Sequence, residues 1–187
     1  MWKLRLGEWL FQKRDFTPIP FIALAIFMIQ PTPFSVILGM HMITLGAAIR
    51  FWGVGHIGGI SRTRSRSTGD LVDTGPFSIC RNPLYVGNFF LSTGFVVGAG
   101  AWTLVPLFIA LFAFQYHFIV LWEESNLREK FGAPYDEYCR TVPRWFPKFR
   151  NYRPGETDWE KAKKSERMTW AAMIAVGLFL LVGMVIF

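Results

Sequence analysis

The sequence predicts an all-α membrane protein, a polytopic helical bundle of about five transmembrane helices with a helical polar segment on its cytoplasmic side. The first observation is the placement of charge: charged residues gather at positions 3–15, 62–81 and 123–167, and Arg50 is the only one elsewhere. The second is the length of the uncharged stretches, because a helix needs roughly 20 apolar residues to cross a hydrocarbon core of about 30 Å. The apolar content of 52% is only slightly above the globular range, so charge placement carries the prediction.

Turn residues divide the uncharged stretches into spans. Residues 31–33 are Pro-Thr-Pro and residues 98–100 are Gly-Ala-Gly, and both sequences interrupt helices. The expected spans therefore cover residues 16–30, 34–54, 84–97, 102–122 and 168–187. The first and third are short for a membrane span, so their helices can begin several residues earlier.

This division leaves both tight turns uncharged and puts every Lys and Arg on one side of the membrane, as the positive-inside rule expects of the cytoplasmic face. We predict a multi-pass protein of a prokaryotic inner membrane with a cytoplasmic N-terminus and no cleaved signal peptide. The two cysteines, Cys80 and Cys139, then lie on the reducing side and stay thiols. The chain forms one domain, 1–187, with an interfacial helix at 1–15, four spans within 16–122, a cytoplasmic loop at 55–81, a cytoplasmic segment at 123–167 and a C-terminal span at 168–187.

The loop before the third span ends in Arg81-Asn82-Pro83. Asn82 is a good N-cap and Pro83 suits the first helical position, so a helix is predicted to start here. That role alone would explain the motif. A helix N-terminus also offers free N–H groups to an anion such as a carboxylate, and Arg81 could strengthen such a site.

The fourth span runs into Glu123-Glu124, and negative charge is unfavourable at a helix C-terminus, so the helix is expected to continue. Glu124 could then pair with Arg128 four residues on, whereas Glu123 has no basic residue at that spacing.

The continued helix is expected to end at Phe131-Gly132. A short second helix opened by Pro134 should carry Tyr135 and Tyr138 on one face and end before Pro143. One interpretation is a helical hairpin on the membrane surface, anchored by these tyrosines together with Trp145 and Phe146. The alternative is a site where aromatic faces and a carboxylate bind a cation.

Taken together, these segments resemble the isoprenylcysteine carboxyl methyltransferase family and its phospholipid methyltransferase-like relatives. The resemblance covers about residues 70–147 and depends on the order and spacing of its pieces. The matching residues are Thr74-Gly75-Pro76-Phe77, Arg81-Asn82-Pro83-Leu84-Tyr85-Val86-Gly87, Glu123-Glu124 with Leu127, Phe131-Gly132, Tyr135, Tyr138 and Val142-Pro143-Arg144.

The resemblance implies an integral membrane methyltransferase that uses S-adenosyl-L-methionine, has no Rossmann fold and acts at the cytoplasmic face on a lipophilic acceptor, with 123–167 as its catalytic segment. It implies catalytic roles for Glu123 and Arg144. The cofactor-contacting set that it implies is Gly69, Asp70, Leu71, Val72, Phe77, Arg81, Asn82, Pro83, Leu84, Tyr85 and Glu123.

Two departures from the family pattern bear on the acceptor. Many members have His where this chain has Asn82, and an amide cannot act as a base that titrates near neutral pH. Members that methylate prenylcysteine place an Arg shortly before the Glu pair, and residues 118–122 contain none. Isoprenylcysteine carboxylate, a phospholipid and a thiol therefore all stay open as acceptors.

Other functions compete with this one. The net charge of +7 is explained by membrane topology, so no nucleic-acid partner is expected, and no metal site is predicted. A transporter should carry ionisable groups inside its spans, and histidines are the only such groups expected there. His41 and His117 could hold a haem between helices, and a non-catalytic adaptor also remains open. The oligomeric state is not predicted.

Overall fold

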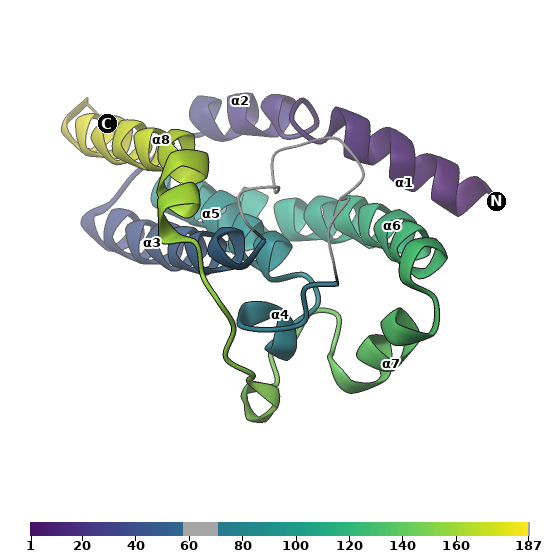
Figure 1. Ribbon diagram of the computed structural model, residues 1–187. Helices are drawn as coiled ribbons and strands as arrows, with labels where there is room; N and C mark the ends of the chain where they lie inside the picture. Colours follow the sequence, from purple (N-terminus) through teal and green to yellow (C-terminus); the bar gives the residue numbers. More distant parts are fainter. Residues whose placement is uncertain (58–70, 187) are drawn as a thin grey trace.

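The computed structural model describes residues 1–57 and 71–186, and within these ranges it contains helices and no strand (Figure 1). The predicted all-α membrane bundle is confirmed. Its α-helices are α1 (Trp2–Lys13), α2 (Ile19–Phe27), α3 (Pro33–His56), α4 (Pro76–Ile79), α5 (Pro83–Gly98), α6 (Val105–Phe131), α7 (Ala133–Thr141) and α8 (Trp159–Ile186), and its short 3₁₀ helices are η2 (Trp102–Leu104) and η3 (Phe149–Asn151).

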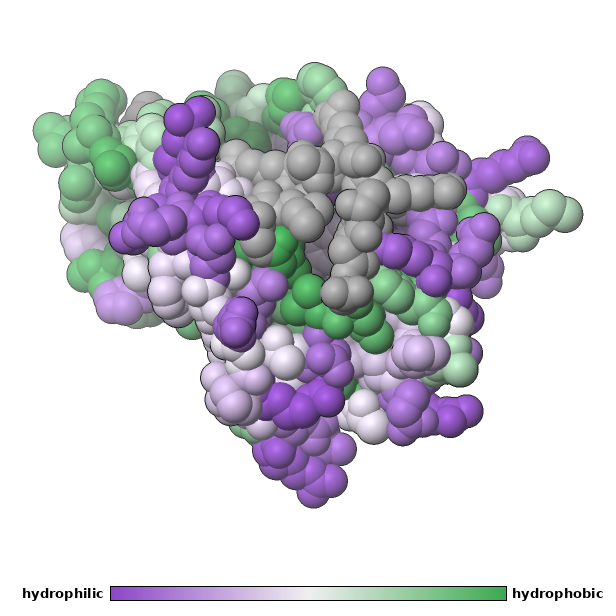
Figure 2. Space-filling model, viewed as in Figure 1, coloured by the Kyte–Doolittle hydropathy of each residue, from purple (hydrophilic) through white to green (hydrophobic). Residues whose placement is uncertain are grey.

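Within the described residues, three helical segments are long and apolar enough to cross a membrane. They are α3, the continuous stretch Trp102–Phe131 and α8, with mean hydropathies of 1.6, 2.1 and 2.4 over their most apolar windows. Only 11% of the α8 window is buried within the protein, so most of its apolar surface is available to lipid. Figure 2 shows hydrophobic residues gathered towards the end of the molecule that carries the C-terminus and many hydrophilic residues on the part with α7 and η3.

Two of the five predicted spans correspond to short helices. α5 has 16 residues and α2 only nine, so neither reaches the length of a full span by itself. The count of five therefore remains a prediction. The C-terminal helix begins at Trp159, earlier than the predicted start of the last span at residue 168.

Helices α3 and α5 form the most closely packed pair in the described part of the chain. Thr32 and Ser35 cap the start of α3 reciprocally, at 3.1 and 2.9 Å, and Pro33 occupies its first position. Further along, Gly39 faces Gly94, where a Cβ on Gly39 would lie only 2.5 Å from the Gly94 carbonyl oxygen. Glycine is therefore required for the two backbones to approach this closely.

The polar end of the molecule is built by α6 and α7. As predicted, α6 continues through Glu123-Glu124 to Phe131, and Gly132 reverses the chain with φ of +59°. α7 then ends at Thr141, before Pro143. Helix α1 packs on α6, where the rings of Phe11 and Trp122 lie 4.8 Å apart. The position of α1 in a membrane interface stays a prediction.

Candidate functional site

Two loops that are far apart in the sequence run side by side below the start of α5. The Arg81 N–H donates to the Pro143 carbonyl at 2.9 Å, and the Lys148 N–H donates to the Ile79 carbonyl at 2.9 Å. The Asn82 amide also donates to the Arg144 carbonyl at 3.1 Å. The fold therefore joins the two sequence segments that carry the predicted site residues.

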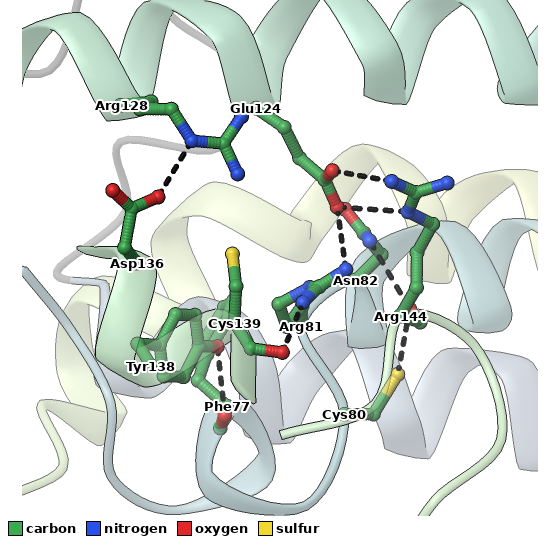
Figure 3. Close-up of polar contacts among 10 residues, drawn as sticks. All are labelled: Phe77, Cys80, Arg81, Asn82, Glu124, Arg128, Asp136, Tyr138, Cys139 and Arg144. Atoms are coloured by element: carbon green, nitrogen blue, oxygen red, sulfur yellow. Dashed lines mark hydrogen bonds and ion pairs between the residues drawn. The ribbon is translucent and has the colours of Figure 1, made fainter. Parts of the chain in front are cut away.

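The centre of this junction is the arginine–glutamate cluster, which consists of Arg81, Glu124 and Arg144 (Figure 3). Arg144 binds the Glu124 carboxylate with two nearly parallel hydrogen bonds, Nε to Oε1 at 2.9 Å and Nη2 to Oε2 at 2.6 Å. Arg81 Nη2 lies 3.0 Å from Glu124 Oε1. This hydrogen bonding by Glu124 raises the pKa of Arg144 above its ordinary value.

This arrangement corrects the expected pairing of Glu124 with Arg128. Glu124 is buried, 5% exposed, and holds two arginines from distant loops, while Arg128 instead binds Asp136 at 2.6 Å. The i, i+4 spacing places Arg128 on the same helix face, but α7 folds back and brings the competing carboxylate. The cluster contains two guanidinium groups and one carboxylate, so it keeps a net positive charge.

Asn82 precedes α5, as predicted, but its side chain makes no capping hydrogen bond to the helix because its amide faces Arg144. Arg81 uses one terminal nitrogen on Glu124 and donates from the other to the Cys139 carbonyl at 2.8 Å. Its Nε is buried and has no hydrogen-bond partner among the described residues. Within that part of the chain, this N–H is a free donor at the start of α5.

Glu123 lies on a different side of α6 from the arginine–glutamate cluster. Its carboxyl contacts the phenol of Tyr85 and lies in the electrostatic field of Arg14, at the end of α1. The rings of Tyr85 and Tyr116 are packed together with centroids 4.7 Å apart. The two adjacent glutamates therefore lie in different environments, Glu124 between two arginines and Glu123 beside a tyrosine.

The interpretation of Tyr135 and Tyr138 as membrane-surface anchors is wrong. Both are buried, and the Tyr138 hydroxyl donates to the Phe77 carbonyl at 2.8 Å. Burial raises the pKa of each phenol well above its ordinary value. Phe146 is 86% exposed and keeps the surface position expected of an anchor, whereas Trp145 is half-buried. Tyr138 thus fixes α7 to α4, the short helix that carries Phe77.

The other predicted site residues are distributed around this junction. Gly69 and Asp70 lie outside the described residues, and Leu71 packs against the buried side chains of Tyr135, Tyr138 and Val142. Val72 is half-buried in the segment before α4. Pro83 is the first residue of α5. The side chains of Phe77 and Leu84 both lie against Gly53 of α3.

A second polar group within the helices was missed from the sequence. Arg50 of α3 binds Glu166 of α8 through Nε at 3.1 Å and Nη2 at 2.6 Å, and donates to Asn88 Oδ1 at 2.6 Å. The expectation that histidines are the only ionisable groups in the spans is therefore wrong, because Arg50 lies inside α3. Its isolation among apolar residues was the available signal. Nothing marked Glu166 as its partner, since it belongs to a lysine-rich run.

Comparisons with known proteins cover much of the chain. Residues 34–134 match the family model for phospholipid methyltransferases. The chain is 32% identical over 120 residues to the nickel-cobalt-cadmium resistance protein NccN of Alcaligenes xylosoxydans xylosoxydans, covering 64% of this chain and 53% of that protein. It is 35% identical over 132 residues to the cobalt-zinc-cadmium resistance protein CzcN of Cupriavidus metallidurans, covering 68% and 56%. The chain thus spans just over half the length of these relatives, and no solved structure matches it.

Proposed function

Because this chain belongs to the phospholipid methyltransferase family, we propose that it is an integral membrane methyltransferase that uses S-adenosylmethionine to methylate a lipophilic acceptor at the cytoplasmic face of the membrane. The observation that supports this most directly is the junction of two distant loops around Glu124, with Glu123 beside Tyr85 on the same helix. A charged cofactor can reach such a polar junction from water, while an apolar acceptor can arrive from the bilayer.

The residues present fit the charges of this cofactor. The start of α5, the available Arg81 Nε and the net positive arginine–glutamate cluster suit its carboxylate. The Glu123 carboxyl suits its cationic parts. The remaining proposed contacts are Gly69, Asp70, Leu71, Val72, Phe77, Asn82, Pro83, Leu84 and Tyr85.

When bound, S-adenosylmethionine supplies an electrophilic methyl group to a nucleophilic atom of the acceptor. The contribution of the protein is to hold the two reactants in line and exclude water, since correct orientation alone can lower such a barrier by about 7–11 kcal/mol. Glu123 and Arg144 have different parts in this proposal. Glu123 complements the cofactor, whereas Arg144 positions the loop of residues 143–148 through its bidentate contact with Glu124.

Calorimetric titration of the purified protein with adenosylhomocysteine tests the proposed cofactor site. The double variant Glu123→Gln, Asn82→Ala should weaken binding by about tenfold or more, since each change removes a charged or hydrogen-bonding group worth roughly 1–3 kcal/mol. Glu129→Gln is the matched control, because Glu129 is an exposed carboxylate on the same helix. Unchanged binding by a folded double variant would contradict the assignment. Absence of binding by the folded wild type would favour a non-catalytic adaptor.

The acceptor is addressed by a methyl-transfer screen. Isoprenylcysteine, phosphatidylethanolamine and small thiols represent the three acceptor classes that the sequence leaves open. Transfer that depends on the purified protein and on Glu123 would identify the class. No transfer to any of them by a protein that binds adenosylhomocysteine would exclude these three classes.

The names of the relatives suggest a physiological role in metal resistance. The described residues contain no group of three or more His, Cys, Asp or Glu side chains that could hold a metal ion. Since the family match indicates a methyltransferase, we propose that such a role would act through methylation of a membrane component. Growth of a deletion strain on nickel, cobalt and cadmium, complemented by wild type or Glu123→Gln, tests this. Complementation by both would show that resistance does not need the proposed site.

A further inference from the structure

A cavity of about 420 Å³ lies between helices α2, α3, α5, α6 and α8, away from the arginine–glutamate cluster. Most of its lining is apolar. The apolar side chains that form its walls include Phe21, Ile43, Leu91, Phe95, Phe108 and Met173. Helices α2 and α8 lie outside the residues that match the family model, so part of this cavity belongs to the chain beyond the match. Its volume falls in the lower half of the range of about 300–1,000 Å³ typical of small-molecule sites.

Polar groups are confined to a few positions in this lining, namely Arg50, Asn88, Ser92 and Thr169. The Arg50 guanidinium is held by both oxygens of Glu166 and by Asn88. Glu166 is buried, 1% exposed, and also accepts from the Thr169 hydroxyl at 2.6 Å. Opposite charges thus cancel at this end of the cavity, which offers hydrogen-bonding groups but no unpaired charge among the described residues that line it.

The polar end also leads towards Glu123. The Asn88 amide lies 3.3 Å from the Tyr116 hydroxyl. Tyr116 packs on Tyr85, and Tyr85 contacts the Glu123 carboxyl. Two phenol side chains therefore connect the cavity with the proposed cofactor site. A ligand with its polar end near Asn88 would have its head close to these phenols and its tail among the apolar walls.

From this geometry we propose that the cavity binds the methyl acceptor, and that the acceptor is a single-chain amphiphile with an uncharged polar head. The limited volume favours one hydrocarbon chain over the two chains of a phospholipid. The cancelled charges favour an uncharged head, because a buried ion without a partner is strongly disfavoured. The ligand's role as methyl acceptor rests on the proposed function, whereas occupancy of the cavity does not.

Photolabelling of the purified full-length protein in lipid nanodiscs tests this. The probes are a long-chain alcohol carrying a diazirine, an alkyl sulfonate of the same chain length with the same group, and a diazirine-bearing phosphatidylcholine. The alcohol should label peptides that contain Leu91, Phe95 and Met173. Labelling there by the sulfonate and by the phospholipid should be weaker by about tenfold or more, because burial of an unpaired charge is costly and the volume favours one chain over two.

A cavity-filling variant distinguishes labelling inside the cavity from labelling at the lipid-facing surface of the protein. Ala172→Phe places a ring in the cavity and should reduce labelling by the alcohol about tenfold, since overpacking removes the available space. Ala171→Phe is the matched control, because Ala171 is the neighbouring alanine on the same helix, is exposed like Ala172 and does not line the cavity. Its labelling should equal that of the wild type.

Labelling by the alcohol that Ala172→Phe leaves unchanged would overturn the cavity as a binding site. Equal labelling by the sulfonate would overturn the uncharged head, and equal labelling by the phospholipid would overturn the single chain. Titration of the same samples with adenosylhomocysteine tests the proposed methyltransferase function independently of the cavity. If the wild type labels as expected but does not bind adenosylhomocysteine, the cavity stands and the methyltransferase assignment fails.

Discussion

Replacing Glu124 by glutamine should destabilise the protein more than any other single removal of a carboxylate charge from α6. The substitution keeps the shape of the side chain but leaves Arg81 and Arg144 without a counter-charge. Removal of one partner from a buried ion pair typically costs about 3–5 kcal/mol. The side chain of Arg144 is 32% exposed and can be partly solvated, so we expect a loss nearer about 3 kcal/mol.

Thermal unfolding of the detergent-purified protein, followed by intrinsic tryptophan fluorescence, measures this effect. At roughly 2–4 °C per kcal/mol for a chain of this size, Glu124→Gln should lower the apparent Tm by about 6–12 °C. Glu129→Gln, on the exposed face of the same helix, should change it by less than about 2 °C. Equal effects of the two variants would refute the view that Glu124 holds the two loops together.

Packing and burial lead to three further expected outcomes. Gly94→Ala should lower the free energy of unfolding by about 1–3 kcal/mol, since its Cβ would lie 2.7 Å from a backbone oxygen of α3. The control Gly177→Ala should be nearly neutral, because its Cβ meets only a flexible methionine. Equal Tm values for the two variants would contradict the close approach of the helices. Burial raises the pKa of the Cys80 thiol to about 11. Its labelling by maleimide, measured by mass spectrometry, should therefore be slow near neutral pH and accelerate as pH rises towards that value. Labelling as fast as in the unfolded chain would contradict the burial of this thiol. Arg50→Met should be strongly destabilising, whereas the double variant Arg50→Met, Glu166→Met should recover most of the lost Tm, because it removes both charges together; additive losses would exclude coupling between them.

Local signals predicted the helix boundaries at the site well. Proline at position 83 and glycine at position 132 were correctly placed at a helix start and a chain reversal, because each acts through its own backbone conformation. The continuation of α6 past Glu123-Glu124 followed from the charge preference of helix ends. The membrane character and the family were also predicted, since both depend on patterns along the chain rather than on contacts across it.

Side-chain partners were predicted poorly. The i, i+4 rule chose Arg128 for Glu124, but the rule compares only residues on one helix, in pairs worth about 0.2–0.5 kcal/mol, which buried partners from other segments easily exceed. One of the two interpretations placed Tyr138 in the membrane interface, whereas its hydroxyl donates to the Phe77 carbonyl inside the protein. Aromatic residues suit both places, so composition could not distinguish them.

The sequence alone therefore determined that this is a helical membrane protein of a methyltransferase family, because charge spacing, turn residues and motif order are properties of the linear chain. Only the tertiary structure decided which groups meet. Arg50 and Glu166 are 116 positions apart, and the contact between them depends on how α3 and α8 pack. Charge pairing at such separations is set by helix packing, which no local preference encodes. The same packing joins the two loops around Glu124 and forms the separate cavity that Arg50 lines.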